Sequence, residues 1–325
     1  MVKIGVVGCG HIGKIHIEQL KQISEVSLIG VLDKRIETAK TVSIQFGIPF
    51  CSNLEELLQI TEAIIIATDS DSHFEIAQQC IKAGKHVFIE KPLTLDISQA
   101  LELVHMSKES NVYCMVGHVE RFNIAYTSVK RLILNPLFIE SHRLASFSSK
   151  LATESVVLDL MIHDIDIVLS LVKSEINRIS ATGVKVISDS IDIANARIEF
   201  SNGCIANLTA SRISQYAMRK TRVFQQDKYF NIDFLHRESE VVELIDANHA
   251  KYNPDLQAIQ VANQATKYLY IEQWKNLENN AILDEMKNFV ESIQMRKTPI
   301  ISAEVAYTSM QVADKILKKI YSLND

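Results

Sequence analysis

Residues 156–166, which read VVLDLMIHDID, place four ionisable side chains in a mostly apolar stretch. If the stretch is helical, Asp159 and His163 lie four residues apart on one face, Asp166 stays near that stripe, and Asp164 points about 100° away. Carboxylates and imidazoles are costly to bury without partners, so we expect the helix to direct a polar edge to water or into a cleft. There a neutral His163, with a reference pKa of about 6.5, could take the proton of a substrate hydroxyl, while Asp159 holds the imidazole or the substrate.

Two other interpretations fit the same residues. His163 could be a helix histidine with a purely structural partner. His163, Asp164 and Asp166 could instead bind a metal, because all three are ligand types. A single H-D-x-D without a second histidine cluster is weak support for a metal site, and we predict none.

Size and composition limit the class of protein. A chain of 325 residues suits about two domains. The net charge of −5 offers no electrostatic argument for binding nucleic acid or an anionic membrane surface, and no apolar run reaches the roughly 18 residues of a membrane span. The five cysteines are scattered and lack a C-x-x-C, which predicts reduced thiols in a cytoplasmic protein. The N-terminus MVKIGVVGCG is too short for a signal peptide and is better interpreted as a first strand.

The first third of the chain alternates Val/Ile-rich runs with amphipathic segments. The predicted strands cover 3–8, 27–33, 63–68, 86–91 and 112–118, with helices such as 73–85 and 96–110 between them. Continuous apolar runs suit strands that are buried on both faces, so the alternation predicts an α/β domain with a parallel sheet between helices. We place this domain at 1–119.

The pattern changes after about residue 120. Strand-like runs with turn signals cover 138–147 and much of 176–273, which predicts a largely antiparallel sheet. The predicted helices cover 122–134, 156–172, 280–295 and 303–321. We therefore expect an α+β domain for substrate binding and oligomerisation at 120–325.

A G-x-G-x-x-G motif joins the first predicted strand to the helix that follows it. The motif consists of Gly8, Cys9, Gly10, His11, Ile12 and Gly13. The first glycine permits a tight turn, the second lets the backbone approach a pyrophosphate, and the third lets the helix pack close to the strand. The helix N-terminus then presents unpaired N–H groups and its positive dipole end to the phosphates. This context predicts a Rossmann-type, doubly wound domain that binds a dinucleotide.

An acidic residue in the expected position favours NAD as the dinucleotide. Asp33 ends the second predicted strand, twenty residues after Gly13, where an acid binds the hydroxyls of the adenosine ribose. Its charge would also repel a 2′-phosphate. Lys34 and Arg35 could bind that phosphate, which leaves NADP as the alternative.

Motifs further along the chain resemble a known family. Glu90-Lys91-Pro92 follows a predicted strand, and Asp159 and His163 form a D-x-x-x-H pattern. Together with the glycine motif, these features resemble the Gfo/Idh/MocA oxidoreductases, which include glucose-fructose oxidoreductase and inositol dehydrogenase. The resemblance covers almost the whole chain and includes ATDSDSH (67–73), AGKHVFIEKPLT (83–94) and GHVERFN (117–123).

The resemblance implies roles for single residues. Lys91 would lie beside the nicotinamide and the substrate, where a cation can polarise the reacting oxygen, and His163 would be the acid/base. The implied cofactor-side residues are Thr68, His73, Glu90 and Lys91. Asp69 stands where many members of the family have proline.

Within the family, GHVERFN, FIESHRLASF and VVLDLMIHDID resemble the sugar-nucleotide dehydrogenases, in particular those that oxidise the 3-hydroxyl of UDP-N-acetylglucosamine. The candidate substrate-binding residues are His118, Arg121, Asn123 and Arg143. Arginine is suited to bidentate phosphate contacts, so Arg121 could pair with a diphosphate. A salt bridge at the domain junction explains Arg121 equally well, and Arg143 has the same two interpretations.

We therefore predict an NAD-dependent oxidoreductase that oxidises a ring hydroxyl of a sugar or sugar nucleotide. The alternatives are an inositol or free-sugar dehydrogenase of the same family and a non-catalytic NAD-binding regulatory protein, because fold alone does not establish catalysis. The intact Lys91, Asp159 and His163 favour an enzyme. Relatives often pair their sheets, and an exposed apolar sheet face commonly marks an interface, so we expect a homodimer or homotetramer formed through the C-terminal sheet.

Overall fold

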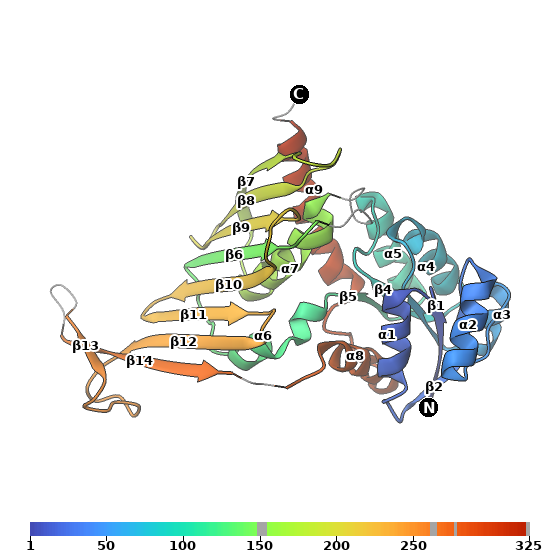
Figure 1. Cartoon of the computed structure of the whole chain (residues 1–325), viewed down its shortest axis with the longest axis horizontal. Coiled ribbons are helices and arrows are strands. Elements are labelled where there is room, and N and C mark those ends of the chain that lie inside the picture. The colour runs from blue at the N-terminus through green and yellow to red at the C-terminus, as the bar shows by residue number, and fades with distance from the viewer. Residues whose placement is uncertain (148–154, 261–264, 276–277, 323–325) are drawn as a thin grey trace. The chain divides into compact units, whose positions relative to one another are not determined.

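The computed structural model describes residues 1–147, 155–260, 265–275 and 278–322, which fold as two compact units (Figure 1). The first unit contains residues 1–119 and 280–311, and the second contains 120–279 with the C-terminal segment from 312. The chain thus leaves the first unit after residue 119. It returns at residue 280 and leaves again at 312, so the first of the two closing helices belongs to the first unit.

The first unit is built on a parallel sheet of five strands in the order β2-β1-β3-β4-β5. The strands are β1 (Val2–Val7), β2 (Val26–Leu32), β3 (Ala63–Ile66), β4 (His86–Glu90) and β5 (Cys114–Gly117). The Ile64, Ile65 and Ile66 side chains of β3 have no exposed surface, as expected for a strand covered on both faces. The strand order reverses between β1 and β3, and ligands of such sheets bind at the carboxyl ends of the strands beside this switch point.

Helices accompany these strands, and three of them carry side-chain caps. They are α1 (His11–Leu20), α2 (Ile36–Phe46), α3 (Leu54–Ile60), α4 (His73–Lys82), α5 (Ile97–Glu109) and α8 (Ala281–Met295). The side chains of Asn53, Asp96 and Asn280 accept hydrogen bonds from the first turns of α3, α5 and α8, which satisfies N–H groups that otherwise lack partners. By contrast, Gly10 begins α1 and supplies no side-chain cap.

The second unit is built on a sheet of nine strands in the order β13-β14-β12-β11-β10-β6-β9-β8-β7. The strands are β6 (Phe138–Leu144), β7 (Ile176–Val184), β8 (Ile193–Phe200), β9 (Ile205–Ser211), β10 (Met218–Gln225), β11 (Lys228–Asp233), β12 (Glu238–Ile245), β13 (Gln257–Ile259) and β14 (Lys267–Trp274). The described strand pairs are antiparallel except β6 with β9. The predicted fold class, a parallel α/β sheet followed by a largely antiparallel α+β part, is confirmed.

The predicted helix over 122–134 is shorter in the structure. A 3₁₀ turn covers Val119–Phe122, Asn123 caps a new helix, and α6 extends only over Ile124–Val129. The Gln225 side chain explains why the helix does not continue. Its amide donates to the Leu132 carbonyl and its oxygen accepts from the backbone of Leu134, so these backbone groups pair with β10 instead of with a further helical turn.

The predicted helix over 156–172 has two parts. A π-helical turn covers Val157–Met161, and α7 (Ile162–Leu171) continues as an α-helix. The α7 helix packs on β6 and β9. In a π-helix, backbone hydrogen bonds join residues five apart. The relative orientation of the Asp159 and His163 side chains therefore differs from the one expected for a uniform α-helix, in which residues four apart share a face.

Candidate functional site

The glycine turn after β1 has the geometry that a dinucleotide needs. Gly8 has a φ of +97°, and a Cβ there would lie 2.4 Å from the Ala67 carbonyl oxygen. A Cβ on Gly13 would lie 1.9 Å from the Gly8 oxygen, whereas no atom lies within 4 Å of a Cβ on Gly10. Gly8 and Gly13 are thus required by the protein's own packing, while Gly10 leaves open space beside the backbone, which fits a pyrophosphate.

Two further features surround this open space. The exposed residues His11 and Ile12 form the first turn of α1, whose N–H groups have no side-chain cap and therefore suit an anion. The Asp33 carboxylate follows β2 and accepts hydrogen bonds from the backbone N–H groups of Cys9, at 2.8 Å, and Arg35, at 2.9 Å. These bonds orient Asp33 beside the glycine turn, as a ribose-binding acid requires.

The cations next to Asp33 contact carboxylates. The Lys34 ammonium lies 2.7 Å from the Asp69 carboxylate, which follows β3, and both side chains are exposed. This hydrogen bond raises the pKa of Lys34 and lowers the pKa of Asp69. The Arg35 guanidinium lies 4.0 Å from Asp33.

Thr68 and His73 connect the loop after β3 to the segment after β4. His73 is buried, with Nδ1 2.8 Å from the Pro92 carbonyl oxygen and Nε2 3.2 Å from the Thr68 carbonyl oxygen. The Thr68 hydroxyl accepts a hydrogen bond from Ser72. His73 thus joins two of the loops that end beside the glycine turn.

Glu90 and Lys91 lie at the carboxyl end of β4, and Glu90 contacts a residue that sequence reasoning missed. The Glu90 carboxylate lies 2.6 Å from Nε2 of His16, which is buried in α1, and it accepts the Lys91 backbone N–H at 3.2 Å. Burial by itself raises the pKa of Glu90, but the hydrogen bond with His16 and the charges of His16 and Lys91 leave this pKa below its ordinary value. A histidine on the otherwise apolar buried face of α1 was the signal that could have identified His16. His118, the last predicted site residue of this unit, is buried just after β5.

In the second unit, two arginines bind the aspartates of α7. Arg143 on β6 donates from Nε and Nη2 to the two oxygens of Asp164, at 3.0 and 3.1 Å. Arg121 donates from Nε and Nη2 to Asp166, at 2.6 and 3.2 Å. Burial alone would lower the pKa of each guanidinium, but the paired carboxylates raise both.

Glu120 extends this network and was not predicted from the sequence. It accepts a hydrogen bond from Nη1 of Arg143 at 2.9 Å and another from the side-chain amide of Asn123 at 3.0 Å. The Asn123 amide also donates to the Phe234 carbonyl, and its oxygen caps α6 through the Ala125 N–H. Arg143 and Asn123 are both buried, and their polar atoms face protein groups.

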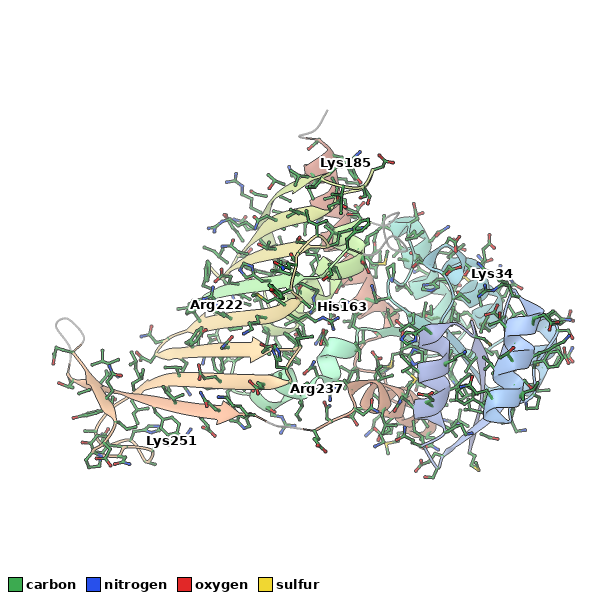
Figure 2. The ribbon with its side chains drawn as sticks, in the orientation of Figure 1. Lys34, His163, Lys185, Arg222, Arg237 and Lys251 are labelled. Carbon is green, nitrogen blue, oxygen red and sulfur yellow. The ribbon has the colours of Figure 1, made fainter. Side chains whose placement is uncertain are left out.

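Asp159 is buried like Asp164 and Asp166, whereas His163 is more exposed. Asp159 is 5% exposed on the π turn, where its N–H donates to the Ser155 carbonyl. His163, labelled in Figure 2, is half-buried in the first turn of α7. The predicted site residues therefore form two sets, with Lys91 in the first unit and Asp159 and His163 in the second.

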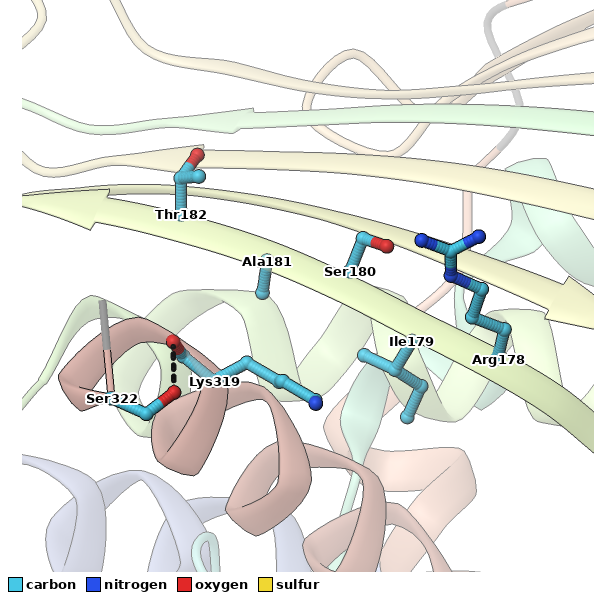
Figure 3. Close-up of a pocket in the computed structure, with 7 residues that line it drawn as sticks. All are labelled: Arg178, Ile179, Ser180, Ala181, Thr182, Lys319 and Ser322. Atoms are coloured by element: carbon cyan, nitrogen blue, oxygen red, sulfur yellow. Dashed lines mark hydrogen bonds between the residues drawn. The ribbon is translucent and has the colours of Figure 1, made fainter.

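A cavity of about 360 Å³ lies in the second unit between β7 and the end of α9 (Ala303–Tyr321), as Figure 3 shows. It is lined by Arg178, Ile179, Ser180, Ala181, Thr182, Lys319 and Ser322. None of the predicted site residues lines it. Among the described residues, no group of histidine, cysteine, aspartate or glutamate side chains is placed to hold a metal ion. No helix of the described ranges is long and apolar enough to cross a membrane.

A doubly wound sheet with an open glycine turn and a ribose-type acid defines a dinucleotide-binding protein. Residues 2–118 match the model of an oxidoreductase family with an NAD-binding Rossmann fold, and residues 117–229 match the GFO/IDH/MocA C-terminal domain. The chain therefore belongs to the Gfo/Idh/MocA family of oxidoreductases, which confirms the predicted family. It is a dehydrogenase with an NAD-binding Rossmann domain.

Individual relatives are similar to the chain over most of its length. UDP-N-acetylglucosamine 3-dehydrogenase of Acidithiobacillus ferrooxidans is 35% identical over 236 residues, which cover 72% of this chain and 75% of that protein. A solved structure of that enzyme covers 99% of this chain and 98% of its own, with 28% identity and a TM-score of 0.89. Myo-inositol 2-dehydrogenase of Thermotoga maritima is 25% identical over 324 residues, 93% of this chain and 91% of that protein.

Proposed function

We propose that the protein is an NAD-dependent dehydrogenase that oxidises a ring hydroxyl of a sugar nucleotide, with the 3-hydroxyl of UDP-N-acetylglucosamine as the specific candidate. The observation that carries this proposal is the 35% identity to a UDP-N-acetylglucosamine 3-dehydrogenase over 72% of the chain. The open space at Gly10 and the orientation of Asp33 support the cofactor part of the proposal.

The proposed preference for NAD over NADP rests on two carboxylates. Asp33 would bind the ribose hydroxyls of NAD and repel a 2′-phosphate. Asp69 engages Lys34, a cation that could otherwise bind that phosphate. Both acids lie in the first unit, and the proposal places the 2′ position of the bound cofactor beside them.

The proposed chemistry assigns one task to each reactive side chain. NAD, when bound, accepts the hydride. His163 removes the hydroxyl proton as a general base, and Asp159 holds the imidazole or a substrate hydroxyl. Lys91, as a cation, polarises the reacting oxygen and stabilises the developing alkoxide charge.

The four proposed substrate residues differ in how their side chains are engaged. Arg143 and Asn123 both donate hydrogen bonds to Glu120. This favours a role in holding the residues that contact the substrate, not in contacting it themselves. Arg121 keeps 15% of its side-chain surface exposed while it pairs with Asp166. We therefore place Arg121 nearest to a substrate diphosphate, with His118 as a second candidate.

A cyclitol or free-sugar dehydrogenase is the second candidate function. It is favoured by the 25% identity to myo-inositol 2-dehydrogenase, which extends over 93% of this chain. The same residues would perform the same proton and hydride transfers, so the discriminating question is whether the substrate must carry a uridine diphosphate.

The deciding experiment measures NADH formation by the purified protein with UDP-N-acetylglucosamine, myo-inositol and glucose in parallel. A ketone-trapping reagent is included because alcohol oxidation by NAD can stop at an unfavourable equilibrium. Turnover with the nucleotide sugar alone supports the proposal. Turnover with inositol or glucose alone selects the second candidate, and NADH binding without turnover on any substrate contradicts both.

We further propose that the nine-stranded sheet pairs with that of a second copy to form a homodimer or homotetramer. Ile271 on β14 is 49% exposed, and an apolar patch exposed on a sheet commonly marks an interface. Light scattering at working concentration tests this, and a monomeric mass contradicts it.

A further inference from the structure

The contact between His16 and Glu90 joins two functional segments of the first unit. His16 lies on α1, the helix that begins at the glycine turn, and Glu90 is the last residue of β4, directly before Lys91. Their side chains meet at 2.6 Å although the residues are 74 positions apart. His16 is 1% exposed, so water does not compete strongly for this hydrogen bond.

The surroundings of His16 indicate which ring nitrogen carries the proton. Nδ1 of His16 is buried and has no hydrogen-bond partner among the described residues. Nε2, which lies 2.6 Å from the Glu90 carboxylate, is therefore the ring nitrogen that donates to it.

The second oxygen of the Glu90 carboxylate also has defined neighbours. It accepts the backbone N–H of Lys91 at 3.2 Å. On the neighbouring strand β5, a Cβ on Gly117 would come within 3.1 Å of this oxygen, so a larger residue there would require the carboxylate to shift. In the described part of the unit, the charged or titratable groups that act on Glu90 are His16 and Lys91. Both favour the ionised carboxylate.

We propose that His16 is a positioning residue that keeps Glu90 ionised and oriented as a fixed countercharge for Lys91. The inference rests on the proposed function, because it assigns the His16–Glu90 pair to the side chain that is proposed to polarise the reacting oxygen. The charge of Lys91 acts on Glu90, and the cation at position 91 is the group proposed to stabilise the developing alkoxide. Because His16 belongs to α1, the same contact fixes the end of β4 relative to the helix that follows the glycine turn.

The pair has a direct consequence for pH dependence. The hydrogen bond with His16 lowers the pKa of Glu90, so removal of the donor raises that pKa. Activity that requires the ionised carboxylate is then lost at a higher pH on the acidic side of the profile. If His16 only filled space, its replacement would change stability without moving the acidic side of the pH profile.

The test compares the wild type with His16→Leu, His16→Gln and Glu90→Gln. Leucine removes the donor, glutamine at position 16 supplies an amide donor, and glutamine at position 90 removes the charge but keeps an acceptor for His16. His105→Gln on the exposed face of α5 is the matched control. The first readout needs no turnover: acetic anhydride reacts with the unprotonated amine, and peptide mass spectrometry measures its rate at Lys91 at fixed pH.

We expect Lys91 to react severalfold faster in Glu90→Gln, which lacks the neighbouring anion, than in the wild type. The increase should be smaller in His16→Leu, where the carboxylate keeps its charge but loses its donor. The rate in His16→Gln should lie close to that of the wild type and of His105→Gln. If His16→Leu does not fold, the Lys91 rates of the wild type and Glu90→Gln are compared instead. Equal Lys91 rates in the wild type and in Glu90→Gln would overturn the proposal.

The second readout is the pH profile of kcat in the presence of saturating NAD. We expect the acid limb to move to higher pH in His16→Leu and to return in His16→Gln. If the wild type turns over none of the tested substrates, the proposed function fails while the labelling result still decides the role of the pair. If the wild type is active and neither the profile nor the labelling changes in His16→Leu, the positioning role is excluded and the function stands.

Discussion

Arg143 on β6 and Asp164 on α7 form a buried ion pair with two parallel hydrogen bonds, at 3.0 and 3.1 Å, and only 3% of each side chain is exposed. The pair joins the helix that carries His163 to the central part of the nine-stranded sheet. It also explains why an apolar helix contains so many acids: Asp164 and Asp166 bind arginines. Asp159 and His163 remain as the pair proposed for chemistry.

Removal of the Arg143 guanidinium should destabilise the second unit strongly. Arg143→Ala leaves Asp164 and Glu120 buried without their main partner, and loss of one member of a buried pair costs about 3–5 kcal/mol. Urea unfolding followed by circular dichroism measures the change. Arg178→Ala, at an exposed position on β7, is the control and should change stability by less than about 0.5 kcal/mol. Equal stability of the two variants would show that the pair does not anchor α7.

Replacement of His163 should separate cofactor binding from catalysis. We expect His163→Ala to bind NADH normally, because the cofactor residues lie in the other unit, and to lose about 10²–10⁴-fold in kcat, as is typical for a general base. His142→Ala on β6 is a matched control, since His142 is a partly exposed histidine of the same unit. Retained turnover in His163→Ala would exclude His163 as the base.

Cofactor choice should respond to the two acids near Lys34. Asp33→Asn removes the charge that opposes a 2′-phosphate, and we expect the ratio of NADPH to NADH affinity to rise about tenfold, or about 1.4 kcal/mol. Asp69→Asn releases Lys34 and should raise the ratio by only a few fold, because exposed ion pairs are weak. Fluorescence titration with both reduced cofactors measures the ratio, and Asp71→Asn on the same loop is the control. An unchanged ratio in Asp33→Asn would refute the proposed basis of NAD preference.

The three glycines of the turn should respond differently to alanine. Gly13→Ala places a Cβ 1.9 Å from a backbone oxygen, so we expect loss of the folded first unit. Gly10→Ala meets no protein atom within 4 Å, so the thermal midpoint should stay within about 2 °C of the wild type. NADH affinity should nevertheless fall at least tenfold, because the methyl group occupies the space proposed for the pyrophosphate. Normal NADH binding by Gly10→Ala would place the phosphates elsewhere.

Several features could be predicted from the sequence because short segments determine them. The Val/Ile runs at 63–66 and 86–90 indicate strands buried on both faces, and the glycine turn specifies strand, loop and helix within a dozen residues. Asp33 follows from its distance to that turn. These patterns depend on backbone sterics and on which faces are buried, and neighbouring residues largely decide both.

Only the tertiary structure decided which charges meet. Nothing in the spacing of His16 and Glu90, or of Arg143 and Asp164, indicates that they touch, because strand order and helix packing bring them together. The π turn at Val157–Met161 could not be predicted from the sequence either, since one additional residue in a helical turn hardly changes the pattern of apolar residues. The sequence by itself thus determined the dinucleotide turn and supplied the candidates for the reactive side chains. The fold determined their partners, because a buried charge is stable only where the packed chain supplies its counterpart.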